Sequence, residues 1–381
     1  MKSDKILLYV INVDWYFRLH WLDRAKHFRS SGFKVHILTN FTDSDFKIKL
    51  INEGFFCHHF PLKRKSLNLL NEIHSILSIH QTIKKISPSI VHAITIKPNI
   101  YVGLIRKITS KFPVIYNITG LGIIFSSKTA IFRLFRKLSI LLYRLISTKN
   151  SYFIFENSDD LRIFIAEKII NNNGFLIKGA GVDIEKFYPS VPMGRSIVLF
   201  AARLLKDKGL NDLIEAREIL AADGISFIIR VAGILDGDVH FAISEHQIQY
   251  WHNNGKIEWL GQVHDMPSLI ESCDIVCLPT TYGEGVPRIL IEAAASQRPI
   301  VATDIAGCRE IVDHGVNGLL CAPSNPQALA KSLRTLLANN LIMKAYGING
   351  RRKVINEFAQ EHVFESTQKI YDALLSTHCF F

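Results

Sequence analysis

Segments with the pattern of a buried strand alternate with segments that have a helical pattern, and this series occurs twice along the chain. Residues 5–13 are apolar enough for a strand buried on both faces, residues 15–31 have a helical pattern, and residues 34–39 form the next strand. Strands that alternate with helices pair in parallel, because each helix carries the chain back across the sheet. The alternation continues to about residue 183, which predicts a doubly wound α/β domain.

The pattern starts again after residues 187–195, a short segment with two prolines. With 381 residues, of which 48% are hydrophobic, the chain can bury two cores. We therefore predict two Rossmann-like doubly wound domains facing a cleft, in which ligands bind at the carboxyl ends of the strands. The expected boundaries are 1–188, 189–362, and a C-terminal helix within 363–381 that could pack back on the first domain.

The charge is divided unevenly between the two halves. Residues 1–190 contain 28 Lys and Arg against 13 Asp and Glu, whereas residues 191–381 contain 17 against 21. A basic excess confined to one half indicates a polyanionic partner, such as an acidic membrane, a lipid-linked phosphate or a nucleic acid.

Two absences narrow the class of protein. The six cysteines show no zinc-ligand spacing and are interpreted as reduced, small apolar residues. Neither a signal peptide nor a charge-free stretch of about 20 apolar residues is visible, so a cytoplasmic protein is expected.

The segment Leu278–Ala295, read LPTTYGEGVPRILIEAAA, combines a strand end, a glycine-containing loop and a helix start. The N-terminus of a helix attracts anions. Glu284 and Glu292 are about two helical turns apart, so their carboxylates project from the same side and can accept hydrogen bonds from hydroxyl groups. A nucleotide sugar has both kinds of group. The alternative is an ordinary helix start with no ligand.

Two cations follow the strand expected at 197–200. Arg203 offers a planar fork and Lys208 a point charge, a combination that suits a diphosphate. They would stabilise the charge that develops on a departing nucleotide without a metal ion. Equally, both could be solvated loop cations.

The sequences ARLLKDKG, EGVPRILIE, TDIAGCREIVDHGVNGLL and GAGVDIEKFYP resemble the retaining nucleotide-sugar glycosyltransferases of family GT4, which have the GT-B fold. The resemblance covers nearly the whole second half. It implies that Arg203, Lys208 and Glu284 are the catalytic residues. It also implies a donor site made of Arg203 and Lys208 at the diphosphate, Glu284, Gly285, Val286 and Pro287 at the sugar and phosphate, Glu292 at the ribose, and Val263 at the base.

The first half departs from the usual GT4 pattern. It lacks the Gly-Gly pair after the first strand, and Thr119 stands where a histidine is expected. Its segments DWYFRLH, HAITIKPNIYVGL, NITGLGIIF and ENSDD resemble a bacterial subgroup that extends undecaprenyl-diphosphate-linked sugars, including N-acetylgalactosaminyltransferases of O-antigen assembly and protein N-glycosylation. The acceptor-binding residues implied by this resemblance are Asp14, Arg18, His20, His92, Lys97, Thr119 and Gly120. For each a structural role is the alternative, such as a core histidine at His92.

The segment Lys128–Lys149 contains six basic residues, no acidic residue and many Ile, Leu and Phe. This composition is typical of a helix that lies on an anionic bilayer, although a helix partly covered by its own domain would look similar. The basic run Leu62–Lys65 is a further candidate for the same face. The enzyme is therefore expected to be peripheral on the inner face of the cytoplasmic membrane.

The resemblance predicts a retaining transfer of a hexose, best an N-acetylhexosamine such as GalNAc, from a UDP-sugar to a polyprenyl-diphosphate-linked sugar in surface polysaccharide synthesis. No cofactor or metal is expected beyond the UDP-sugar co-substrate, although Asp43–Asp45 and Asp236–Asp238 resemble a metal-binding Asp-X-Asp sequence. The rival hypotheses are a sugar-nucleotide epimerase of the same fold and a basic membrane-binding or nucleic-acid-binding module.

Overall fold

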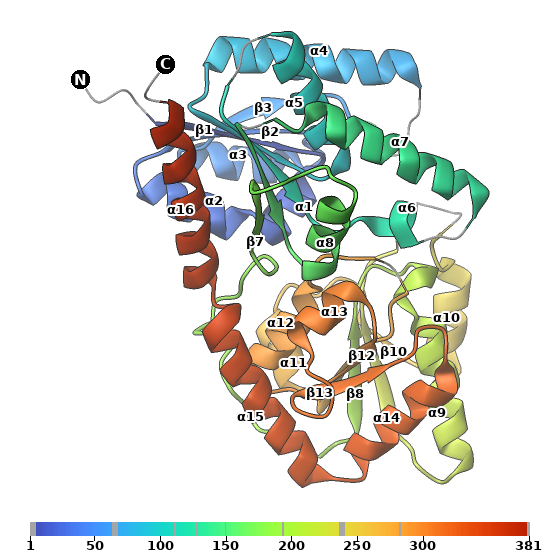
Figure 1. Cartoon of the computed structure of the whole chain (residues 1–381). Coiled ribbons are helices and arrows are strands. Elements are labelled where there is room, and N and C mark those ends of the chain that lie inside the picture. Colours follow the sequence, from blue (N-terminus) through green and yellow to red (C-terminus); the bar gives the residue numbers. More distant parts are fainter. Residues whose placement is uncertain are drawn as a thin grey trace. The chain divides into compact units, whose positions relative to one another are not determined.

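The computed structural model describes residues 5–62, 68–109, 112–126, 129–148, 150–192, 194–235, 241–281 and 283–378. The chain divides into two compact units, one of residues 1–180 together with 363–381, the other of residues 181–362 (Figure 1). Each unit is built on a parallel sheet with helices on both faces, which confirms the α/β class and the doubly wound architecture. The division falls between Ala180 and Gly181, a few residues before the expected boundary at 188.

The first unit contains a seven-stranded parallel sheet in the order β3-β2-β1-β4-β5-β6-β7. The chain leaves β1 toward one edge and later adds β4 on the other side of β1, so the strand order reverses between these two strands. Ligands bind beside such a switch point in open α/β sheets. The strands are β1 (Ile6–Ile11), β2 (Lys34–Thr39), β3 (Phe56–His59), β4 (Ile90–Ile94), β5 (Val114–Ile118), β6 (Ser151–Phe155) and β7 (Gly174–Leu176).

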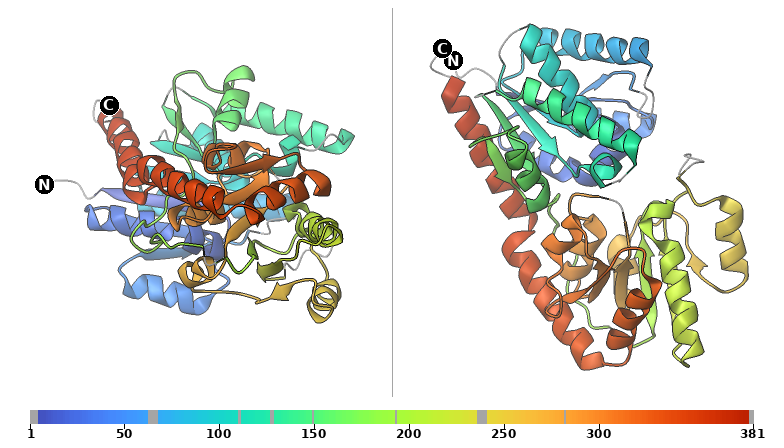
Figure 2. Two further views of the ribbon diagram at one scale, coloured as in Figure 1. Left: turned by 90° about the horizontal axis from the view of Figure 1, so that it is seen from below. Right: turned by 45° about the vertical axis from the view of Figure 1, so that its right-hand side comes forward.

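Two hydrophobic clusters cover the two faces of this sheet. The apolar sides of α4, α5, α7 and α8 pack on one face, and those of α1, α2, α3 and the C-terminal α16 on the other (Figure 2). Strands buried on both faces explain the continuous apolar runs in the sequence. The helices are α1 (Asp14–His20), α2 (Leu22–Ser30), α3 (Ser44–Asn52), α4 (Leu69–Ile86), α5 (Ile96–Ile108), α6 (Gly122–Ser126), α7 (Ala130–Ile146), α8 (Ser158–Ala166) and α16 (Gln360–His378).

A buried polar group anchors α16 to the first unit. The Tyr371 hydroxyl lies 2.7 Å from His92 Nδ1 and 3.2 Å from the Tyr9 hydroxyl, and all three side chains are fully buried. Burial of a polar group is costly unless a hydrogen bond replaces the lost water. The Tyr371 hydroxyl is therefore bonded to both side chains, and these bonds fix the position of the helix on the sheet.

Replacing Tyr371 by Phe is expected to lower the free energy of unfolding by about 1–2 kcal/mol, because buried groups on His92 and Tyr9 lose their partner while the ring still fills its space. Urea titration measures the change. Tyr250→Phe is the matched control, since Tyr250 is half exposed and should lose almost nothing. Equal midpoints for the two variants would contradict the anchoring role.

The second unit contains a six-stranded parallel sheet in the order β10-β9-β8-β11-β12-β13, whose strand order reverses between β8 and β11. One continuous hydrophobic core fills both faces. The strands are β8 (Ile197–Ala201), β9 (Ile228–Ala232), β10 (Glu258–Trp259), β11 (Ile275–Leu278), β12 (Ile300–Thr303) and β13 (Gly318–Cys321). The helices are η1, a 3₁₀ turn (Lys206–Lys208), α9 (Leu210–Ala222), α10 (Glu245–Asn253), α11 (Met266–Glu271), α12 (Arg288–Ala295), α13 (Ala306–Ile311), α14 (Pro326–Leu337) and α15 (Asn340–Glu357).

No helix in the described part of the chain is both long enough and apolar enough to span a bilayer.

Candidate donor-binding site

The loops that follow β8 and β11 lie against each other at the switch point of the second sheet. Gly209, which ends η1, has a φ of +81°, and a Cβ there would overlap the carbonyl oxygen of Pro279. The backbone N–H of Thr281 donates to the carbonyl of Asp207 at 2.8 Å. Glycine permits both the left-handed backbone and the close approach. The two loops are therefore held together by their backbones.

This contact brings Lys208 and Glu284 together. The ammonium group of Lys208 forms an ion pair with Glu284, and the Thr280 hydroxyl lies 3.5 Å from the same carboxylate oxygen. Lys208 is only 7% exposed, so the charge stands in a poorly hydrated setting where its interactions are stronger than in water. Arg203 follows the same strand, β8, and its positive charge acts on Lys208. The structure thus gathers the three residues predicted to be catalytic.

Helix α12 carries the second carboxylate of the pair. Glu292 is 5% exposed and accepts a hydrogen bond from Arg288 Nε at 2.6 Å. Burial raises the pKa of Glu292, while the neighbouring Arg288 guanidinium acts in the opposite direction. Arg288 was not among the predicted site residues, although its spacing of four from Glu292 is the signal of an ion pair on one helix face.

A third loop, between β12 and α13, contacts the Glu284 segment. A Cβ at Gly307, at the start of α13, would overlap the carbonyl oxygen of Gly285. The Thr303 hydroxyl at the end of β12 donates to the carbonyl of Thr280. Gly307 lies within the TDIAGC sequence that carried the family resemblance, but the sequence assigned it no role. The structure shows that its missing side chain lets α13 approach the loop.

The other predicted donor residues occupy less central positions. Gly285, Val286 and Pro287 are buried and lead into α12. Val263 follows β10 and is partly buried against the core of the second unit. Val263 therefore lies after the edge strand of the same sheet, with β9 between that strand and β8, and its predicted contact with the base stays a prediction.

Two predicted acceptor residues are buried within the first unit, which corrects the expectation for them. Asp14 is 1% exposed and accepts hydrogen bonds from the backbone N–H groups of Thr42 and Asp43 at 2.6 and 2.8 Å. His92 is fully buried and bonded to Tyr371. Burial lowers the pKa of His92 well below its usual value, so the ring is neutral. Both side chains serve the fold, and neither reaches the surface where an acceptor would bind.

The remaining predicted acceptor residues lie in α1, in α5 and in the turn after β5. Arg18 pairs with Asp43, Lys97 pairs with Glu72 at 2.8 Å, and the ring of His20 lies against that of Tyr16. Thr119 and Gly120 are partly exposed. Because α1 follows β1 and α5 follows β4, these residues lie near the switch point of the first sheet, and their contact with an acceptor stays a prediction.

Comparison with known proteins identifies the chain. Two family models match it, "Glycosyl transferase 4-like" over residues 5–157 and "Glycosyl transferases group 1" over residues 182–353. The chain is a GT4-family glycosyltransferase. Its fold is GT-B, as in the structure of Anabaena HepE in complex with UDP-glucose, which is 21% identical and covers 97% of this chain and 99% of its own with a TM-score of 0.76.

Two curated relatives of the glycosyltransferase match most of its length at 24% identity. One is the capsular polysaccharide biosynthesis glycosyltransferase CapM of Staphylococcus aureus, for which the match covers 91% of this chain and 92% of the relative. The other is the N,N'-diacetylbacillosaminyl-diphospho-undecaprenol alpha-1,3-N-acetylgalactosaminyltransferase of Campylobacter jejuni, with 86% and 88% covered. The expected fold, family and enzyme class are confirmed.

The structure describes one of the two Asp-X-Asp sequences, and its first aspartate makes contacts within the first unit. Asp43 caps α3 by accepting the N–H of Phe46, and it also pairs with Arg18. Asp236–Asp238 lie outside the described residues. Within the described ranges, no group of three or more His, Cys, Asp or Glu side chains is placed to hold a metal ion.

The affinity of the glycosyltransferase for UDP is expected to fall as the pH rises through about 8. Burial lowers the pKa of Lys208 to about 8, with Arg203 acting in the same direction, while the neighbouring Asp207 carboxylate acts in the opposite direction. A neutral amine loses its attraction for phosphate. Calorimetric titration with UDP from about pH 7 to about pH 9.5 measures the change.

Loss of folding would not explain such a decline. An unfolded lysine titrates near 10.5, so between about pH 8 and 10.5 the unfolded chain holds more protons at this position than the folded chain. The contribution of this group to the free energy of unfolding therefore increases as the pH rises through this range. Lys208→Arg is the control variant, because its guanidinium stays charged and its affinity should not change over this range. An unchanged wild-type affinity up to pH 9.5 would contradict the prediction.

Proposed function

We propose that this glycosyltransferase transfers an N-acetylhexosamine, best GalNAc, from a UDP-sugar to a hydroxyl group of an undecaprenyl-diphosphate-linked sugar, with retention of configuration and without a metal ion. The product would serve the synthesis of O-antigen or a related surface polysaccharide. The observation that carries the proposal is the grouping of Arg203, Lys208 and Glu284 at the switch point of the second sheet, next to the Arg288–Glu292 pair.

The chemistry of these groups suits a nucleoside-diphosphate donor. As the bond between the sugar C1 and the diphosphate oxygen breaks, negative charge grows on the diphosphate, and the Arg203 and Lys208 cations stabilise it. The acceptor oxygen attacks C1 from the face that the diphosphate leaves, and its proton passes to the departing diphosphate. Glu284 and Glu292 would accept hydrogen bonds from hydroxyl groups of the sugar and the ribose.

The acceptor and the donor sugar are proposed from the relatives and from the charge. The name of the Campylobacter jejuni relative specifies GalNAc transfer to an undecaprenol-diphosphate-linked sugar, and HepE was solved with UDP-glucose. A polyprenyl-linked acceptor requires work at a membrane, and the basic excess of residues 1–190 suits the inner face of the cytoplasmic membrane. We assign acceptor binding to Arg18, His20, Lys97, Thr119 and Gly120.

Product analysis tests the proposal. The purified protein is incubated with single UDP- and GDP-sugars and a synthetic polyprenyl-diphosphate-linked GalNAc or GlcNAc, with EDTA present, and the lipid product is examined by mass spectrometry. A mass increase of one N-acetylhexosamine with one UDP donor is expected. Isomerised UDP-sugar without a lipid product would favour the epimerase, and a salt-sensitive gel shift with nucleic acid, unaffected by UDP, would favour the binding module.

A further inference from the structure

Helix α7 exposes an apolar stripe on the side that faces away from its sheet. Its opposite side, with Ile140, Tyr143 and Ile146, is packed into the core of the first unit. The stripe residues recur at alternating spacings of three and four, so they share one face of the helix. They are Ile131, Leu134, Leu138, Leu141 and Leu145, each between 48% and 66% exposed. We call this face the leucine stripe.

Four cations stand beside the leucine stripe, around a hollow of about 430 Å³ between α7 and the end of α8. Glu167, which follows α8, is the one carboxylate among the residues lining this hollow. The hollow therefore has a net charge of about +3. The residues that line it are Arg133, Arg136, Lys137, Ile140, Leu141, Arg144 and Glu167.

Glu167 acts as an internal counter-ion for two of the four cations. Its carboxylate lies 3.3 Å from Arg144 Nη2 and 3.8 Å from Arg136 Nη2, and its backbone carbonyl accepts a hydrogen bond from Arg144 Nε at 2.8 Å. These pairs are partly exposed and are therefore weak. An incoming anion could displace the carboxylate at small cost.

We propose that this hollow binds the phosphate of an acidic phospholipid head group in a bilayer, that the phosphate displaces Glu167 from Arg136 and Arg144, and that the leucine stripe enters the head-group boundary. The inference rests on the proposed function in so far as that function places the enzyme at a membrane. It adds a defined head-group site and a residue that weakens the attachment. Charge complementarity and the apolar stripe together favour a bilayer over a soluble anion.

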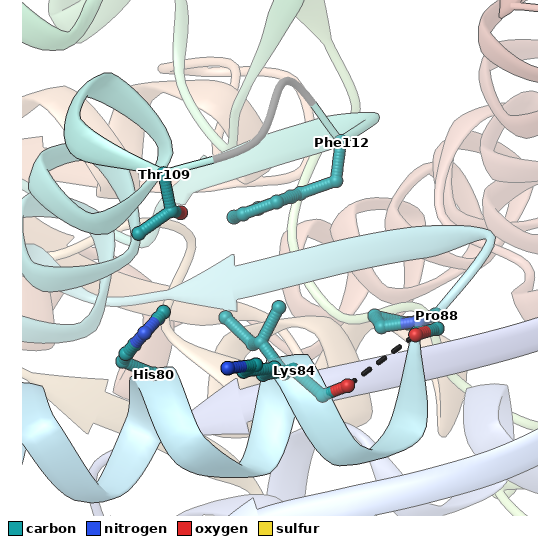
Figure 3. A pocket seen from close by; sticks show the side chains of 7 residues that line it. His80, Lys84, Pro88, Thr109 and Phe112 are labelled. Carbon is teal, nitrogen blue, oxygen red and sulfur yellow. Dashed lines mark hydrogen bonds between the residues drawn. The ribbon is translucent and has the colours of Figure 1, made fainter.

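Another hollow of comparable size on the first unit lacks these features. It lies between α4 and the segment that follows α5, where Thr109 and Phe112 face His80 and Lys84 (Figure 3). Lys84 is the one formally charged side chain that lines it. One exposed ammonium group is a weak attraction for a lipid phosphate, so we assign no ligand to this hollow.

Co-sedimentation with vesicles of phosphatidylglycerol and of phosphatidylcholine tests the inference with the full chain and no donor. The protein is expected to bind the acidic vesicles only, and more weakly as salt is added. Glu167→Gln should bind them about 5-fold more tightly, by the effect of about one charge. The matched control is Glu53→Gln, since Glu53 also pairs with a cation, Lys26, but lies far from α7 in the sequence and on the other face of the sheet. Equal affinities of the two variants would overturn the role of Glu167.

Two further pairs of variants test the hollow and the stripe. Arg133→Gln with Lys137→Gln should lower the affinity about 25-fold, whereas Lys34→Gln with Lys49→Gln, an equal charge change elsewhere in the first unit, should lower it far less. Leu134→Ser should weaken binding more than Leu341→Ser, although Leu341 is 81% exposed. Equal losses within either pair would overturn the site.

Further measurements distinguish a bilayer from other ligands, and distinguish this inference from the proposed function. Calorimetric binding of glycerol phosphate without vesicles, or a shift of RNA that the same Arg133 and Lys137 changes abolish, would overturn the assignment to a bilayer. Vesicle binding needs no sugar transfer. A protein that attaches to vesicles but forms no product would therefore contradict the proposed function alone, and one that forms product in detergent but ignores vesicles would contradict this inference alone.

Discussion

Replacing Arg203 by Ala is expected to lower kcat/KM for sugar transfer about 100- to 1,000-fold and to leave the fold intact. The guanidinium stands beside Lys208 at the carboxyl end of β8 and supplies part of the positive charge that stabilises a departing diphosphate. Loss of one such preorganised donor usually costs about 3–4 kcal/mol in the transition state. Arg203 is partly exposed and contributes nothing to the core, so thermal unfolding should stay near that of the wild type.

Lys206→Ala is the matched control for this prediction. Lys206 lies three residues from Arg203 in the same loop but is exposed, and its removal should change kcat/KM less than about 3-fold. Glu284→Ala should lose activity as Arg203→Ala does, because the variant removes a predicted donor contact and leaves Lys208 without its carboxylate. Wild-type kcat/KM in the folded Arg203→Ala variant would refute the assignment of the donor site.

Gly307→Ala is expected to lower kcat/KM at least about 10-fold and to destabilise the second unit by about 1–3 kcal/mol. The added methyl group would overlap the carbonyl oxygen of Gly285, so either α13 or the Glu284 loop must move. Displacement of a positioned group by about 1 Å can cost a large factor in rate. Steady-state kinetics at varied donor concentration, together with urea titration, measure both effects.

The control for Gly307→Ala is Gly350→Ala in α15. A Cβ at Gly350 would meet the Cβ of Ala294 at 3.3 Å, a tight contact that a small shift relieves, and alanine favours the helix. Gly350→Ala should therefore keep its activity. If Gly307→Ala were as active as Gly350→Ala, the close approach of α13 would have no importance for the site.

The charged residues proposed for the donor site could be singled out from the sequence because they are close to one another along two short segments. Arg203 and Lys208 are separated by only five positions after one strand, a spacing that the motif itself indicates. The expectation of two helical turns between Glu284 and Glu292 is wrong, because α12 begins at Arg288 and Glu284 lies in the loop before it. The fold was predictable for a similar reason. Short apolar runs such as residues 6–11 and 197–201 favour strands buried on both faces, and these require helices on each side.

The acceptor side was harder to predict because burial depends on distant residues. His92 lies in the middle of the apolar strand β4, and its partner Tyr371 comes from the last helix of the chain. Asp14 was expected to bind the acceptor, but its carboxylate accepts the N–H groups of a loop almost thirty positions away. A local pattern contains no information about either partner.

The sequence by itself determined the family, the two parallel sheets and the identity of the charged groups proposed to meet the donor, because periodicity and closely spaced motifs are local properties. Only the tertiary structure decided that Lys208 pairs with Glu284, that Gly307 lets α13 pack closely against the Gly285 carbonyl, and that His92 belongs to the core. It also showed which side of α7 is exposed and that Glu167 holds two of its cations. These outcomes depend on which elements the folded chain places in contact, since burial and pairing are properties of neighbours in space.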